Sequence, residues 1–141
     1  MKKLLYPLFA LLILFTVGCG DDDDTNPLVG VWEMTSASFL IQSNPSETIT
    51  ITADNDNSET MILGEDGTYS VSGNEDGYSY SCSGSWSSTA NKLTIMEDGE
   101  DTLILDFSIS GSTLTLISNG TYGGNYDESW DMVTTMTYTK S

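Results

Sequence analysis

Histidine and arginine are absent from this chain of 141 residues. Without histidine the chain lacks the commonest general base and the commonest zinc ligand, and without arginine it lacks the bidentate clamp for carboxylates. Its many serines therefore have no histidine to activate them as nucleophiles. Two acids such as Glu33 and either Asp106 or Glu128 could cleave glycosides, but nothing in the sequence brings them together. We expect no enzymatic activity, no cofactor and no metal site.

Positive charge is also scarce. The chain has four lysines and 21 acidic residues, which gives a formal net charge of −17. Nucleic-acid binding requires lysines and arginines that neutralise phosphates, and adhesion to anionic lipid headgroups requires the same charges. Both functions are excluded for the folded part of the chain. The negative field repels anions and attracts cations or basic surfaces.

The N-terminus has the composition of an export signal. Lys2 and Lys3 precede an apolar run over residues 4–17, which is shorter than the ~20 residues that span a bilayer. The run ends at Gly18 and Cys19, a junction that resembles the lipobox of bacterial lipoproteins. The sequence therefore predicts a lipoprotein signal peptide over residues 1–18 and lipidation of Cys19. The alternatives are a plain signal peptide with an incidental cysteine and an uncleaved anchor.

A run of acidic residues follows Cys19 directly: Asp21, Asp22, Asp23 and Asp24. A block of like charges repels itself and cannot join a core, so we expect residues 19–26 to be an acidic tether. The run resembles the stretch that directs some lipoproteins to the outer face of the outer membrane. We expect a lipid-anchored protein at the cell surface, which contacts the membrane only through the lipid on Cys19.

Residues 27–141 are predicted to form one all-β domain. Apolar and polar residues alternate with period two, and Gly67, Gly77 and Gly99 each close an Asp-Gly turn signal. An antiparallel up-and-down β-barrel of about eight strands is the simplest architecture, because closure leaves no free edges. A β-sandwich is the alternative. We expect eight or nine strands near residues 29–40, 47–53, 60–64, 67–73, 77–87, 92–96, 102–109, 113–118 and 129–139.

Cys82 lies in a segment where serine alternates with larger or less polar residues, from Tyr78 to Trp86. This alternation places its side chain on the apolar face of a strand. If Cys19 is acylated, Cys82 has no partner for a disulfide in this chain. We expect Cys82 to be a small buried hydrophobic residue.

The order of several short motifs resembles the lipocalin-like domains of bacterial lipoproteins. These motifs are Gly30-Val31-Trp32, Leu63-Gly64-Glu65-Asp66-Gly67-Thr68-Tyr69, Gly84-Ser85-Trp86, Asn91-Lys92-Leu93-Thr94-Ile95 and Ser110-Gly111-Ser112-Thr113-Leu114-Thr115-Leu116. The resemblance implies that Trp32 plugs the closed end of a barrel and that a basic side chain covers it. Lys140 is the only late candidate, so we predict a cation–π contact between Lys140 and Trp32. The chain departs from lipocalins in lacking arginine and a helix after the last strand.

An eight-stranded barrel is filled by its side chains or holds one small ligand. We predict that a small apolar or amphiphilic molecule binds inside, because methionine and tyrosine suit an adaptable pocket. The inward-facing candidates are Met34, Tyr78, Tyr80, Trp86, Phe107, Trp130, Met132 and Met136. The alternative is a filled core in a non-catalytic module that contacts a protein or glycan. Such a module would use its acidic face or the aromatic loop around Tyr122, Tyr126 and Trp130.

One segment matches the ligand spacing of a calcium-binding loop. The matching residues are Asp54, Asp56, Ser58, Thr60 and Glu65. Glu59, however, occupies the position where the sharp turn of such a loop needs glycine, and no helices flank the segment. We interpret the segment as a solvated loop between strands.

Overall fold

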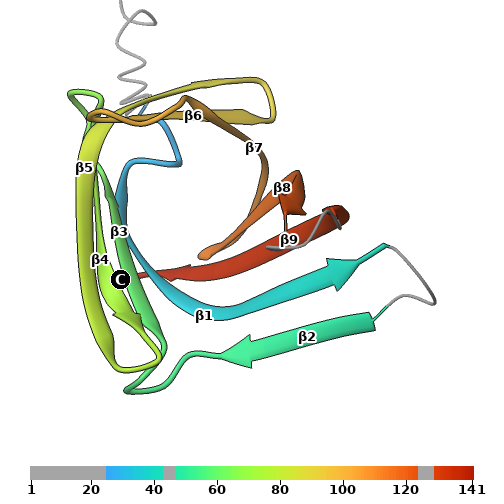
Figure 1. Cartoon of the computed structure of the whole chain (residues 1–141). Helices are drawn as coiled ribbons and strands as arrows, with labels where there is room; N and C mark the ends of the chain where they lie inside the picture. The colour runs from blue at the N-terminus through green and yellow to red at the C-terminus, as the bar shows by residue number, and fades with distance from the viewer. Residues whose placement is uncertain (1–24, 43–46, 124–128) are drawn as a thin grey trace, which may run out of the picture.

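The computed structural model describes residues 25–42, 47–123 and 129–141, which form nine antiparallel strands and no helix (Figure 1). The predicted signal peptide, Cys19 and the acidic run lie outside these residues. Each predicted strand range overlaps an observed strand, and the all-β prediction is confirmed. The strands are β1 (Gly30–Ile41), β2 (Glu47–Thr52), β3 (Ser58–Leu63), β4 (Thr68–Glu75), β5 (Tyr78–Thr89), β6 (Lys92–Glu97), β7 (Leu103–Ser110), β8 (Thr113–Gly123) and β9 (Ser129–Lys140).

Eight of the strands close into a barrel, and β2 is an extra strand beside it. Strands β3 to β9 pair in the order in which they follow one another, and β1 completes the ring by pairing with β3 on one side and β9 on the other. The predicted antiparallel up-and-down barrel is therefore confirmed, and the alternative of two stacked sheets is excluded. Figure 1 shows β2 continuing along β1, away from β3, β4 and β5.

Strand β1 has three neighbours because its pairing changes along its length. Its first residues pair with β3, whereas the part from Ser36 onward pairs with β2. The register with β9 shifts between Met34 and Ser36, so Thr35 forms a β-bulge. In a regular strand, Trp32 and Ala37 would lie on opposite faces. The extra residue reverses the alternation, so both side chains are buried on the same face.

The turns between neighbouring strands carry the predicted glycines in left-handed backbone conformations. Gly67, Gly77 and Gly99 have φ angles of 82°, 81° and 90°. Asp76 and Gly77 together connect β4 to β5 in a two-residue hairpin in which both φ angles are positive. This is the pattern of a type I′ turn, whose twist matches that of the flanking strands. The Asp-Gly turn signals are therefore confirmed.

The core fills the closed end of the barrel. Its fully buried members come from six strands and the preceding turn, and the largest are Trp32, Tyr138, Leu28, Met61, Leu63, Leu93, Leu105, Leu114 and Leu116. The Trp32 indole donates a hydrogen bond of 2.7 Å to the Leu28 carbonyl. The Lys140 Nζ atom lies 5.2 Å from the centre of the Trp32 ring. The predicted cation–π contact at the closed end is confirmed.

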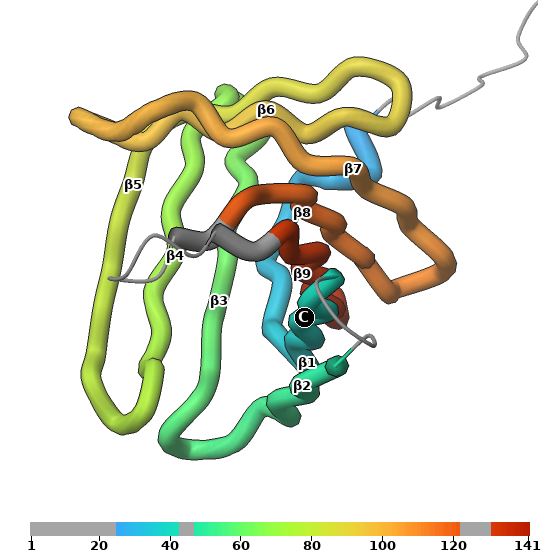
Figure 2. The backbone as a smooth tube through the Cα atoms, turned by 45° about the vertical axis from the view of Figure 1, so that its right-hand side comes forward, coloured from blue at the N-terminus to red at the C-terminus, as the bar shows by residue number. Residues whose placement is uncertain are grey.

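The opposite end of the barrel is wider because neighbouring strands lose their pairing there. Only residues 84–89 of β5 pair with β6, so residues 78–83 are not paired with that strand. Only residues 113–117 of β8 pair with β7. Figure 2 shows β3, β4 and β5 on one side of the molecule and β8 and β9 on the other. The barrel therefore has a mouth at this end.

Candidate functional site

A cavity of about 180 Å³ lies at the mouth of the barrel. Its wall is apolar on one part and polar on the other. The apolar part is formed by Met34, Ala37, Phe39, Ile51 and Met136, and the polar part by Asn57, Glu59, Asn74, Glu75 and Tyr80. Apolar atoms make up most of the wall surface, although half of the lining residues are polar. An apolar surface with convergent polar groups is the usual composition of a small-molecule site.

The apolar part of the wall depends on the bulge in β1. After Thr35 the alternation brings Ala37 and Phe39 to the inner face, the same face that Met34 occupies before the bulge. Ala37 stands between two larger residues, opposite Ile51 on β2 and Met136 on β9. Because Ala37 has only a methyl group, the space between its two neighbours stays open and forms part of the cavity.

The polar part of the wall is organised by Glu59 on β3. Tyr138 donates its hydroxyl hydrogen bond to one carboxylate oxygen of Glu59, and Tyr80 donates to the other. Burial raises the pKa of Tyr138 well above its usual range, and the negative charge of Glu59 adds to the shift. Tyr80 is 37% exposed, and its partial burial together with the hydrogen bond to Glu59 also raises the pKa of its phenol. Both phenols therefore stay protonated and act as donors.

Three of the predicted site residues meet at this cavity: Met34, Tyr80 and Met136. Trp86 and Phe107 are not among the described side chains that line it. Trp86 is only 8% exposed, and its indole donates a 2.9 Å hydrogen bond to the Gly64 carbonyl, so it belongs to the structure of the closed end. Phe107 is half-buried and packs against the core cluster. The prediction that Trp86 and Phe107 face inward is correct, but both lie deeper in the barrel than the cavity.

Two other predicted residues lie elsewhere at the open end. Tyr78 is 80% exposed, because it stands next to the β4–β5 turn on the part of β5 that β6 does not cover. Met132 borders a separate depression together with Asp131 and Gln42. The side chain of Trp130, and with it the predicted aromatic loop, lies outside the described residues.

Glu59, Phe39 and Ile51 line the cavity but are not among the site residues predicted from the sequence. A signal for Glu59 exists, because it precedes Met61 and Leu63 at alternate positions and both are buried. Because the segment matches a calcium-loop spacing, we interpret it from the sequence as a loop, whereas Glu59 lies on β3. Phe39 and Ile51 depend on the bulge and on the pairing of β2, which the alternation does not reveal.

The segment with calcium-loop spacing is divided between a turn and a strand. The Asp54 carboxylate accepts hydrogen bonds from the backbone N–H groups of Asn57 and Asp56, which lower its pKa. Asp54 and Glu65 lie at opposite ends of β3 and do not converge. Among the residues that the structure describes, no group of three or more acidic or cysteine side chains is arranged to hold a metal ion.

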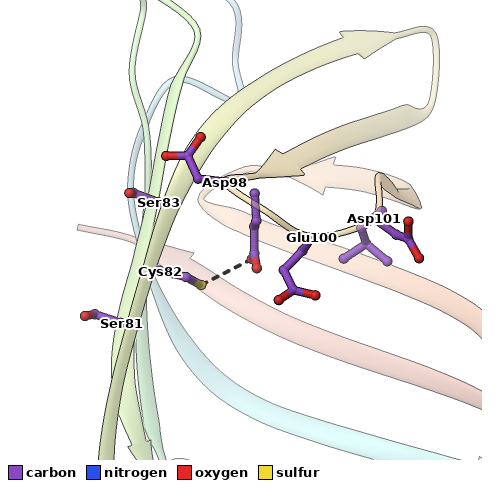
Figure 3. Close-up of a pocket in the computed structure, with 8 residues that line it drawn as sticks. Ser81, Cys82, Ser83, Asp98, Glu100 and Asp101 are labelled. Carbon is purple, nitrogen blue, oxygen red and sulfur yellow. Dashed lines mark hydrogen bonds between the residues drawn. The ribbon is translucent and has the colours of Figure 1, made fainter.

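A larger acidic groove of about 620 Å³ lies where β5 separates from β6. In Figure 3 the Cys82 side chain points into this groove, toward the side where Asp98, Glu100 and Asp101 lie. The Cys82 thiol donates a 3.2 Å hydrogen bond to Glu97. Partial burial and this contact raise the thiol pKa to about 11, so Cys82 is a poor nucleophile. It is half-buried and packs against the core, which is less burial than the sequence predicts.

The fold and the cavity define a small antiparallel β-barrel that is filled at one end and open at the other. Comparison with models of protein families, with curated proteins and with solved structures gave no match. Within the described residues, no helix is long and apolar enough to cross a membrane.

Proposed function

We propose that this chain is a lipocalin-like lipoprotein of the outer membrane that takes a small apolar or amphiphilic molecule into the mouth of its barrel. The cavity at the mouth is the observation that carries the proposal. Its methionines are flexible and polarisable, so they adapt to the shape of an apolar group. The few polar groups on the opposite wall orient the ligand and select it.

The closed end supports the comparison with lipocalins. The Gly-x-Trp motif opens β1, Trp32 is buried beneath the barrel floor, and Lys140 covers its ring. This is the arrangement that the resemblance implies. The anchor at Cys19 and the placement at the cell surface rest on the N-terminal sequence alone.

Binding without catalysis fits the chemistry of the cavity wall. The wall holds carboxylates, amides, one phenol and apolar groups, and none of them is paired as a nucleophile with a base. The mouth is open while the closed end is filled by the core. This favours a ligand-binding barrel over an interaction module with a filled core.

A methionine-methyl NMR titration tests the proposal. The purified protein, labelled with ¹³C at its methionine methyl groups, is titrated with 1-hexanol, and the signals are assigned with single Met→Leu variants. We expect saturable shifts of Met34 and Met136 with a dissociation constant on the order of 1 mM, the range for so small a ligand. Met96, which is 43% exposed and does not line the cavity, serves as the internal control.

Two results would contradict the proposal. The first is the absence of saturable shifts at Met34 and Met136 in the folded protein. The second is an equal response of Met96, which would indicate that hexanol contacts the surface without selecting the cavity.

A further inference from the structure

Glu59 places a carboxylate in the cavity wall, and the described residues supply no positively charged partner for it. The chain has no arginine or histidine. Lys92 is 2.7 Å from Asp106, and Lys140 covers Trp32. Both of these lysines lie at the closed end of the barrel, so the negative charge at the mouth has no counterion from the described part of the chain.

The two hydrogen-bond donors to Glu59 stabilise its charge without neutralising it. Tyr80 and Tyr138 are neutral phenols, and their raised pKa values keep them so at physiological pH. A carboxylate has about four acceptor positions on its two oxygens. The two phenols fill two of them. Glu59 therefore keeps acceptor capacity for a donor on a ligand.

The surroundings of Glu59 also favour a cation over an anion. Glu75 lines the same wall, and the Asn57 and Asn74 side chains already contact neighbouring groups: the Asn57 carbonyl accepts the Asp76 N–H, and the Asn74 amide faces Ser58. The whole chain carries a formal net charge of −17. Such a field concentrates cations at an acidic opening and repels carboxylate ligands.

We infer that the cavity selects a small organic ammonium ion, which donates its N–H groups to Glu59 and places its apolar part against Met34 and Met136. The inference rests on the proposed function and adds the class of ligand. The cavity volume of about 180 Å³ equals the liquid volume of about six water molecules. An amine with a short alkyl or aryl group matches this size.

Three six-carbon probes that differ in their polar head test the inference: n-hexylammonium, 1-hexanol and hexanoate. Binding is measured by the shifts of the Met34 and Met136 methyl signals at pH 7. We expect hexylammonium to bind about tenfold more tightly than hexanol, because its positive charge adds an attraction to the Glu59 carboxylate that the neutral hydroxyl of hexanol lacks. Hexanoate should bind more weakly than hexanol.

A pair of glutamate variants separates the local charge from the field of the whole molecule. Glu59→Gln removes the charge in the cavity and keeps the size of the side chain. Glu33→Gln removes one charge from an exposed position on β1 that does not line the cavity. We expect Glu59→Gln to remove the preference for hexylammonium while hexanol binding persists, and Glu33→Gln to leave the preference unchanged.

The outcomes distinguish the two proposals. If hexanol binds at Met34 and Met136 but hexylammonium binds no more tightly, the ammonium inference is wrong and the ligand-binding barrel stands. If none of the three probes binds, the proposed function itself is wrong. The comparison of the probes on the unaltered protein decides the matter even if Glu59→Gln fails to fold.

Discussion

Ala90 adopts a backbone conformation that suits glycine better than alanine. It begins the two-residue connection between β5 and β6, and its φ angle is 51°. Gly111 holds the same position between β7 and β8, with a φ angle of 60°. The left-handed region costs an L-residue roughly 1–2 kcal/mol because its Cβ atom crowds the following carbonyl oxygen. The two turns therefore form a matched pair with and without this strain.

Exchanging the residues of these two turns is expected to change stability in opposite directions. Ala90→Gly removes the strain but adds freedom to the unfolded chain, so the free energy of unfolding should rise by about 0.5–1 kcal/mol. Gly111→Ala should lower it by roughly 1 kcal/mol. No atom lies within 4 Å of the Cβ position at Gly111, so the loss measures backbone strain alone. Urea denaturation gives both values, and a destabilised Ala90→Gly variant would contradict the argument.

The alternation of residues was enough to identify each strand, but not to place the bulge. The polarity of each strand residue indicates whether its side chain faces the core or the solvent. Asp-Gly signals mark three of the turns, so the strand boundaries follow from the local sequence. The extra residue at Thr35 changes the face of Ala37 and Phe39 only through pairing with β9, a contact between distant parts of the chain. Local patterns carry no information about that pairing.

At the scale of elements, the ends of β1 and β9 close the barrel through one crowded contact. Gly30 has a φ angle of 145°, and a Cβ atom built on it would lie 2.6 Å from Cε of Lys140. The Lys140 ammonium group also donates a 3.2 Å hydrogen bond to the Pro27 carbonyl. Residue 30 therefore has to be glycine for two reasons: its backbone angle is unfavourable for other residues, and a Cβ atom would occupy the space where the Lys140 side chain crosses Trp32.

A double-mutant cycle at this contact separates the two requirements. Gly30→Ala should lower the free energy of unfolding by roughly 2–4 kcal/mol through strain and overlap. Lys140→Ala should cost about 1 kcal/mol through loss of the cation–π contact and of a surface hydrogen bond. In the double variant the overlap disappears while the strain at residue 30 remains, so the loss should be smaller than the sum of the single losses. Additive losses in urea denaturation would contradict the overlap.

At the scale of the whole molecule, the residues of the candidate site could be brought together only once the fold was known. Met34, Tyr80 and Met136 were recognisable as inward-facing residues with suitable side chains. Nothing in the sequence separates them from Trp86, which has the same alternation but lies toward the filled end. Depth along the barrel axis depends on strand register, and register is set by pairing between strands.

Two buried phenols, Tyr69 and Tyr138, and the partly exposed phenol of Tyr80 make the stability of the whole barrel sensitive to pH in the alkaline range. Burial raises the pKa of Tyr69, Tyr80 and Tyr138 above the ordinary value of 10.0, and nearby negative groups add to each shift. The folded protein therefore binds these protons more tightly than the unfolded chain does. Stability from this source is complete below pH 10 and is lost as the pH rises further, because the unfolded chain releases the protons first.

Urea denaturation between pH 8 and pH 11.5 measures this loss. We expect little change in the midpoint from pH 8 to pH 9 and a steep fall above pH 10. Tyr138→Phe should make the midpoint fall less steeply with pH. Tyr138 is the most deeply buried of the three phenols, and phenylalanine has no hydroxyl group to ionise. Tyr78→Phe, at a position 80% exposed, should keep the slope of the unaltered protein. A midpoint that is constant to pH 11.5, or equal effects of the two variants, would show that these phenols do not govern the loss of stability at alkaline pH.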